Sequence, residues 1–176
     1  MFVKFFDYVG IENINEINDI DSFLKKMSGK TFKEGIYRIH NYDEIEKWTK
    51  IVEEAFPKYK GHIRVFGYDW LGRNFAINLD TNTILLFEVG TGEVLDIPAN
   101  FLDFHNIEIA EYHQDSLASI FFEEWYKSSK NYTLSHNECV GYKVPLFLNS
   151  NDDISNLEVS DMEVYWVLMG QLINGI

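Results

Sequence analysis

The sequence predicts an α+β fold, in which a curved antiparallel β-meander has helices packed on one face and at both ends. Strand-like segments follow one another in the middle of the chain, and the loops between them are too short for crossover helices. Segments with helical apolar spacing occur before and after these strands. Hydrophobic residues make up 46% of the chain, which excludes the composition of a disordered protein.

The N-terminal part of the chain alternates helical and strand patterns. Apolar residues recur at helical spacing in two stripes, which predicts a helical segment over residues 1–30. A short strand is expected over residues 36–40. Asn41 and Glu44 have the spacing of a capping box, so they predict a helix that begins there and ends before Pro57.

The middle of the chain, residues 35–100, is expected to be rich in sheet. Four strands are predicted, over residues 62–68, 73–79, 84–89 and 93–97. The segments that join them contain Gly, Asp and Asn, which favour tight hairpin turns. These strands therefore form a meander.

The C-terminal part, residues 101–176, is expected to be mainly helical. Short helices are predicted over residues 99–104 and 107–111, and Asp115 is predicted to cap a longer helix. Residues 140–148 form an extended segment that Pro145 interrupts.

A last helix is predicted near the C-terminus, where Ser160 and Glu163 have capping-box spacing. Beyond them, five residues at helical spacing form a mostly apolar stripe. The stripe consists of Val164, Val167, Leu168, Gln171 and Leu172. No internal repeat or low-complexity linker interrupts the chain, so a single domain over residues 1–176 is expected.

The charge of the chain is distributed unevenly. The formal net charge is −13. Residues 1–73 hold 12 acidic and 12 basic residues, whereas residues 74–176 hold 16 acidic residues against three lysines. An excess of acid argues against nucleic acid and anionic membrane as partners, because both attract basic surfaces. It favours attraction to a basic partner.

The cysteine content and the N-terminus favour a cytoplasmic location. Cys139 is the single cysteine, so an intrachain disulfide is impossible, which fits a reducing compartment. The first residues lack the layout of a signal peptide, and no apolar run reaches the length of a membrane span.

Motifs of catalysis and of metal binding are missing from the sequence. His136 and Cys139 have an HxxC spacing, but no second ligand pair accompanies them. The glycines at 90 and 92 resemble part of a phosphate loop, but Leu95 replaces the third glycine, so a hairpin turn is favoured. Residues 151–153 lack the calcium-loop pattern and favour a polar turn. We therefore expect no catalytic residue, metal or cofactor, and a protein that is not an enzyme.

The best candidate for binding is an aromatic and charged cluster at the predicted tip of a hairpin. Tyr68, Asp69, Trp70 and Arg73 are of the residue types that dominate interfaces. Alternatively, Trp70 folds back onto the core and Asp69 stabilises the turn. With the acids of the C-terminal part added, the candidate partner-binding residues are Tyr68, Asp69, Trp70, Arg73, Glu88, Glu93, Asp152, Asp153, Glu158 and Asp161.

Four long motifs occur in a fixed order along the chain. They are FGYDWLGRNFA over residues 66–76, LFEVGTGE over 86–93, ECVGYKVPLFL over 138–148 and NLEVSDMEVYW over 156–166. From about Gly35 to the C-terminus, the chain thereby resembles the bacterial GAD-like proteins. The C-terminal part of that group resembles the immunity protein of a type VI secretion DNase, and the group is similar to the SUKH superfamily of immunity proteins.

The resemblance implies a SUKH-like domain that binds and blocks a cognate toxin, often a nuclease, and it implies no catalytic residues. Residues 101–176 would be its helical immunity-type part. The acidity agrees, because an acidic protein can occupy the basic cleft of a nuclease. We expect a non-catalytic binding protein that occludes the cleft of a basic nuclease toxin. The alternative is a general protein-interaction or regulatory module without a toxin partner.

Overall fold

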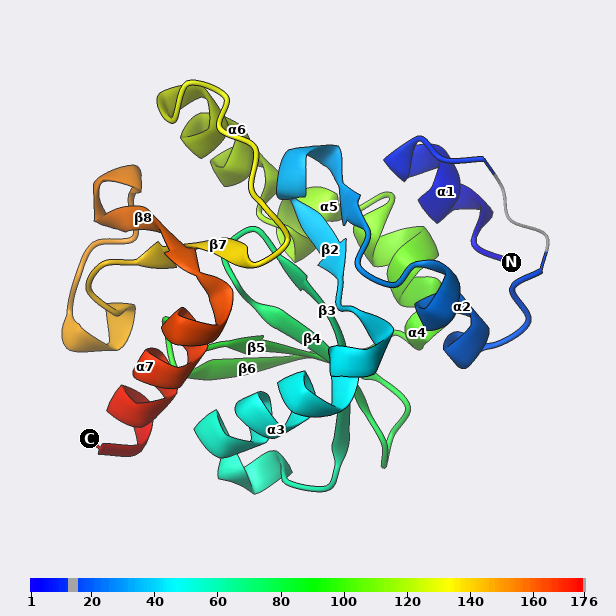
Figure 1. The fold of residues 1–176 in the computed structure, drawn as a ribbon, viewed down its shortest axis with the longest axis horizontal. Coiled ribbons are helices and arrows are strands. Elements are labelled where there is room, and N and C mark those ends of the chain that lie inside the picture. The colour runs from blue at the N-terminus through cyan, green and yellow to red at the C-terminus, as the bar shows by residue number, and fades with distance from the viewer. Residues whose placement is uncertain (13–15, 176) are drawn as a thin grey trace.

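The computed structural model describes residues 1–12 and 16–175, and in these residues the strands form a six-stranded antiparallel sheet and a separate two-stranded sheet. Strands of the larger sheet lie in sequence order, so the predicted meander is confirmed (Figure 1). They are β1 (Thr31–Phe32), β2 (Tyr37–Ile39), β3 (Ile63–Asp69), β4 (Asn74–Asn78), β5 (Ile84–Glu88) and β6 (Glu93–Ile97).

Apolar side chains on the two faces of this sheet pack into two separate cores. Phe66 and Phe75 belong to a larger core, whereas their neighbours Val65 and Ala76 belong to a smaller one. Because alternate residues of a strand point to opposite faces, both faces are buried. The α+β class is confirmed, and the expectation of helices on one face is corrected, because helices cover both.

The N-terminal helices cover the face of the larger core. They are α1 (Val3–Val9) and α2 (Ile20–Lys26), which confirms a helical N-terminal segment in the described part of residues 1–30. Positions 13–15 of that segment lie outside the described residues. Asp19 caps α2 by accepting the N–H of Ser22 at 2.7 Å, and the Ser22 hydroxyl accepts in return the N–H of Asp19.

Helix α3 (Ile45–Ala55) covers the face of the smaller core and ends before Pro57, as expected. Its predicted capping box is wrong. A 3₁₀ turn precedes the helix, and the amide of Asn41 donates to the Glu44 carboxylate at 2.6 Å. The two side chains bond to each other, so neither caps the backbone.

The helices after the sheet differ in detail from the expected ones. Residues 99–104 and 107–111 do not form two helices, because α4 (Phe101–Asp103) continues into a π-helical turn over Phe104–Ile109. Asp115 does not cap the longer helix. It lies within α5 (His113–Ser116), and α6 (Ser119–Ser128) begins after Ala118, whose φ is 48°.

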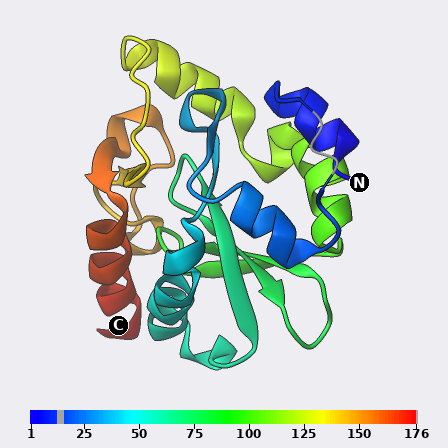
Figure 2. The same cartoon turned by 45° about the vertical axis from the view of Figure 1, so that its right-hand side comes forward.

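The chain ends in a β-hairpin and a helix. Strand β7 (Glu138–Tyr142) occupies only part of the expected extended segment, and its partner β8 (Leu157–Asp161) was not predicted. Helix α7 (Met162–Gly175) follows. Its N-terminus is capped by Asp161 instead of the expected Ser160, because an Asp161 carboxylate oxygen accepts the N–H of Val164 at 3.0 Å. Figures 1 and 2 show α7 lying beside α3, away from α1 and α2.

Candidate functional site

The turn between β3 and β4, residues 69–73, is buried over its whole length. Its backbone is bonded to β7 and to the residue before β2, since the N–H of Trp70 donates to the carbonyl of Ile36 and the carbonyl of Trp70 accepts from Val140 at 2.7 Å. Gly72 has φ 75°, and a Cβ there would lie 3.0 Å from the sulfur of Cys139. Only glycine fits both this backbone and this contact.

Two tryptophans attach the same turn to helices far along the chain. The indole N–H of Trp70 donates to the carbonyl of Leu117 at 2.9 Å, and its ring packs against Trp125 on α6. The indole N–H of Trp166, on α7, donates to the carbonyl of Gly72 at 2.6 Å. The turn therefore joins the meander to the C-terminal part.

This arrangement corrects the hypothesis of an exposed hairpin tip. Tyr68, Asp69, Trp70 and Arg73 are all buried, and Trp70 is 0% exposed. The C-terminal hairpin and helices cover the turn, so these four side chains do not reach a partner in this conformation. The alternative is confirmed, because Trp70 folds back onto the core and Asp69 stabilises the turn.

Asp69 and Arg73 form a buried ion pair. The Nε of Arg73 donates to one carboxylate oxygen of Asp69 at 2.6 Å, and the backbone N–H of Arg73 donates to the other at 3.0 Å. Burial lowers the pKa of Arg73, but the charges of Asp69 and Glu88 outweigh burial and raise it overall. Burial raises the pKa of Asp69, and the positive charge of Arg73 together with its two hydrogen bonds counteracts that rise. The pair fixes the turn, with the Asp69 side chain fully enclosed and the Arg73 side chain 9% exposed.

Sequence reasoning missed further buried polar residues, among them Arg38, His40 and Asn74. Arg38 donates to the backbone carbonyls of Ser135 at 2.8 Å and Glu138, so it ties β2 to the segment before β7. His40 shares a 2.7 Å hydrogen bond with Asn74, and burial lowers the pKa of His40 to about 3, so it is neutral. The available signal was a basic residue and a histidine within an otherwise apolar strand, which marks internal contacts.

Glu88 is half-buried at the end of β5, beside the ion pair. Its pKa is raised to about 7, chiefly by burial. The charge of Arg73 opposes this rise, and the charges of Asp69, Asp152 and Glu93 add to it. The structure therefore places one candidate acid, Glu88, beside the buried Asp69–Arg73 pair.

Glu88 is expected to make stability depend on pH. Its ordinary pKa is 4.5, so the folded protein binds the proton more tightly than the unfolded chain does. Stability from this group is present below pH 4.5 and is lost as pH rises through about 7. Glu88→Gln is expected to match the wild type near pH 4.5 and to exceed it by up to about 3 kcal/mol above pH 7. Urea unfolding at both pH values measures this, and a pH-independent difference would contradict it.

The remaining candidate acids are exposed, and several also have local structural roles. Asp152 accepts the hydroxyl of Tyr142 at 2.8 Å, and Asp153 accepts the N–H of Ser155 at 2.8 Å. Asp161 caps α7. Glu93 and Glu158 lie exposed on β6 and β8. These five acids can therefore meet a partner, unlike the residues of the turn.

Cys139 is buried against the turn, and burial raises the pKa of its thiol to about 12. A neutral, enclosed thiol is a poor nucleophile. We expect iodoacetamide to leave Cys139 unmodified in the native protein at pH 7.5 and to label it rapidly in denaturant, as mass spectrometry would show. Equal labelling rates in the two conditions would contradict its burial.

A surface that sequence reasoning did not single out lies on α7. The apolar stripe expected from the sequence faces solvent, while Met162, Tyr165 and Trp166 on the other side of the helix enter the smaller core. The exposed fractions include 55% for Val164 and 54% for Leu168. We call the four exposed apolar residues, Val164, Val167, Leu168 and Leu172, the α7 stripe.

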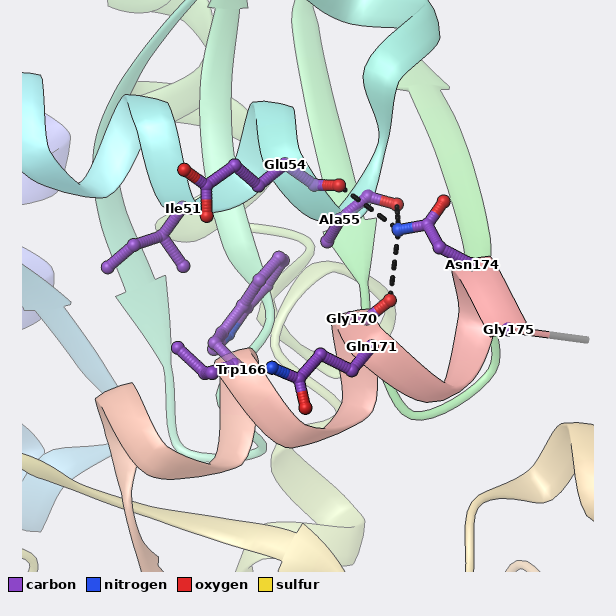
Figure 3. A pocket seen from close by; sticks show the side chains of 9 residues that line it. Ile51, Glu54, Ala55, Trp166, Gly170, Gln171, Asn174 and Gly175 are labelled. Carbon is purple, nitrogen blue, oxygen red and sulfur yellow. Dashed lines mark hydrogen bonds between the residues drawn. The ribbon is translucent and has the colours of Figure 1, made fainter.

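A groove of about 310 Å³ lies between α3 and α7 (Figure 3). We call it the α3–α7 groove. Asn174 spans its end, because its amide donates to the carbonyls of Glu54 at 3.0 Å and Gly170 at 2.9 Å. The carboxylate of Glu54 lies over the groove beside Ile51. The groove is lined by Ile51, Glu54, Ala55, Trp166, Val167, Gly170, Gln171, Asn174 and Gly175.

Among the described residues, no group of three or more His, Cys, Asp and Glu side chains is arranged to hold a metal ion. Within the same residues, the helices are too short or too polar to traverse a bilayer. What the arrangement offers is an apolar surface whose groove is lined by one carboxylate, that of Glu54.

Comparison with known proteins establishes the fold and goes no further. Neither a protein-family model nor a curated protein matches the chain. The structure is similar to the crystal structure of Atu4351 from Agrobacterium tumefaciens, with a TM-score of 0.62 over 97% of this chain and 89% of that one. The two sequences are 15% identical, so this similarity bears on the fold alone.

Proposed function

We propose that this protein is a non-catalytic binding protein of the immunity type, which neutralises a basic nuclease toxin by covering its active cleft. The observation that carries the proposal is the exposed α7 stripe within the acidic part of the chain. Contiguous exposed apolar residues rimmed by polar ones mark interaction sites. The four motifs that resemble GAD-like proteins support the immunity type.

Electrostatics favours a basic protein as the partner. The whole net charge of −13 arises from residues 74–176, and its exposed acids include Glu93, Asp153 and Glu158. A nuclease that binds phosphates presents a basic cleft, so opposite charge would steer the two proteins together. The same charge disfavours nucleic acid as a partner. A cytoplasmic location, where a toxin acting on DNA would be met, completes the proposal.

Co-expression tests this function. The product of the neighbouring gene, expressed alone in a heterologous cell, is expected to be lethal, and co-expression with this protein is expected to restore growth. An inactive nuclease-site variant of that product serves as the control for lethality. A harmless product, or one equally lethal with this protein present, would refute the proposal. A product that binds this protein yet is harmless would favour the general interaction module.

A further inference from the structure

The α7 stripe and the α3–α7 groove form one continuous surface. Val167 belongs to both, since it is exposed on α7 and also lines the groove. Ile51 extends the apolar area onto α3. This area carries little charge. Glu163 is the one charged residue of α7, and it pairs with Lys47 on α3. The surface therefore has an apolar centre.

The groove also concentrates negative potential. Helix α3 ends at Ala55 and helix α7 ends at Gly175, and both residues line the groove. The C-terminus of a helix carries partial negative charge, and here the carbonyls of Glu54, Ala55 and Gly170 already accept the Asn174 amide. Among the described residues Glu54 has no ion-pair partner, and its carboxylate lies over the same groove. The Glu54 carboxylate points toward Ile51, whereas the helices end near Asn174 and Gly175, so the carboxylate and the helix ends stand at different ends of the groove (Figure 3).

We propose that this surface docks a basic protein segment, with one lysine or arginine side chain of the partner entering the α3–α7 groove. This inference rests on the proposed function and identifies the surface that performs it. The aliphatic stem of the side chain packs on Ile51 and Trp166, and its cationic head meets the Glu54 carboxylate. Apolar residues of the partner cover the α7 stripe.

Charge complementarity selects this occupant over others. Residues 144–176 contain five acids and no lysine or arginine, and the two lysines of α3 are paired with Glu163 and Glu46. A second copy of the chain would bring acidic segments and helix C-termini against their own kind, which is unfavourable. A nucleic acid would bring phosphates to the same carbonyls and carboxylates. A basic protein segment instead satisfies both the apolar centre and the negative groove.

Binding measurements with matched variants test the surface. The probe is the purified, inactivated product of the neighbouring gene, titrated calorimetrically against this protein. Leu168→Gln removes stripe contact, and Glu54→Lys reverses the groove charge. Each is expected to weaken binding on the order of 10- to 100-fold. Leu95→Gln is the apolar control, because Leu95 is 49% exposed. Its partner across the strands is Leu86, which packs in the larger core, so Leu95 is on the face of the sheet that α3 and α7 do not cover.

Glu124→Lys is the charge control, because Glu124 is exposed on α6 and the substitution changes the net charge equally. Both controls are expected to bind within about 2-fold of the wild type.

If all variants bind alike, or if the controls lose as much affinity as the site variants, this surface is not the binding site, while the proposed function stands. If the wild type does not bind, the proposed function fails and this inference with it. A wild-type dimer that Leu168→Gln converts to a monomer in sedimentation would show that a second copy covers the stripe.

Discussion

Asp69→Asn is expected to destabilise the protein by about 3–5 kcal/mol, because it leaves the charge of Arg73 buried without a counter-charge. The substitution keeps the shape of the side chain, and the amide oxygen can still accept the backbone N–H of residue 73. The loss of stability therefore measures the effect of removing the negative charge alone. Chemical denaturation at pH 7, followed by tryptophan fluorescence, measures the change in the free energy of unfolding. Trp70, one of the four tryptophans that contribute to this fluorescence, lies within the turn.

Two control variants separate the ion pair from other causes. Asp80→Asn removes an exposed carboxylate that pairs with His62 at 2.8 Å, and it is expected to cost under about 1 kcal/mol. Asp69→Asn combined with Arg73→Met removes both charges, so it is expected to be more stable than Asp69→Asn alone. A loss below about 1 kcal/mol for Asp69→Asn would mean that water reaches Arg73 and that the turn is not closed.

Local patterns predicted much of the fold because they act over a few residues. The meander was visible since its turns are short and hold residues such as Gly72 and Asn82, which both take positive φ. The helix before Pro57 was visible for the same reason. Helix starts were less predictable. Asn41 and Ser160 had favourable spacing, but their neighbours competed for the same hydrogen bonds, and Asp161 capped α7 instead.

The candidate site was less predictable because exposure depends on long-range packing. Trp70 lies in a polar turn by sequence, yet α6 and β7 enclose it, and nothing near residue 70 reports their positions. The α7 stripe presented the opposite case. Apolar residues cover most of α7, so periodicity could not decide which side faces the core. Gly170 marks the side of α7 that faces the core, because its lack of a side chain lets that side approach Ala55 on α3 closely.

Strand β8 was missed for a related reason. Its sequence, Leu157–Asp161, holds two acids and a serine, which weakens the strand signal. Pairing with β7 supplies what the local sequence lacks, because Val159 lies opposite Val140 and Glu158 opposite Gly141. A hairpin whose strands are separated by residues 143–156 cannot be recognised from a tight-turn pattern.

Trp70→Ala is expected to destabilise the protein by about 3–5 kcal/mol, the range for removing a large buried aromatic side chain. The ring is enclosed by Phe121, Phe122 and Trp125, so its removal leaves a cavity between the meander and α6. Thermal unfolding and urea denaturation, followed by circular dichroism, measure the loss. Tyr112→Ala, at a residue that is 53% exposed, is the control and is expected to change stability by under about 0.5 kcal/mol.

Trp70→Phe separates the packing of the ring from its hydrogen bond. Phenylalanine retains most of the apolar contact but cannot donate to the buried carbonyl of Leu117, so a cost of about 1–3 kcal/mol is expected from that unpaired group. If Trp70→Phe were as damaging as Trp70→Ala, the hydrogen bond would dominate the attachment of α6. If both were neutral, the turn would not hold the C-terminal part to the sheet. The expected order, with the alanine variant the least stable, follows because the turn joins the two parts through packed aromatic rings first and through single hydrogen bonds second.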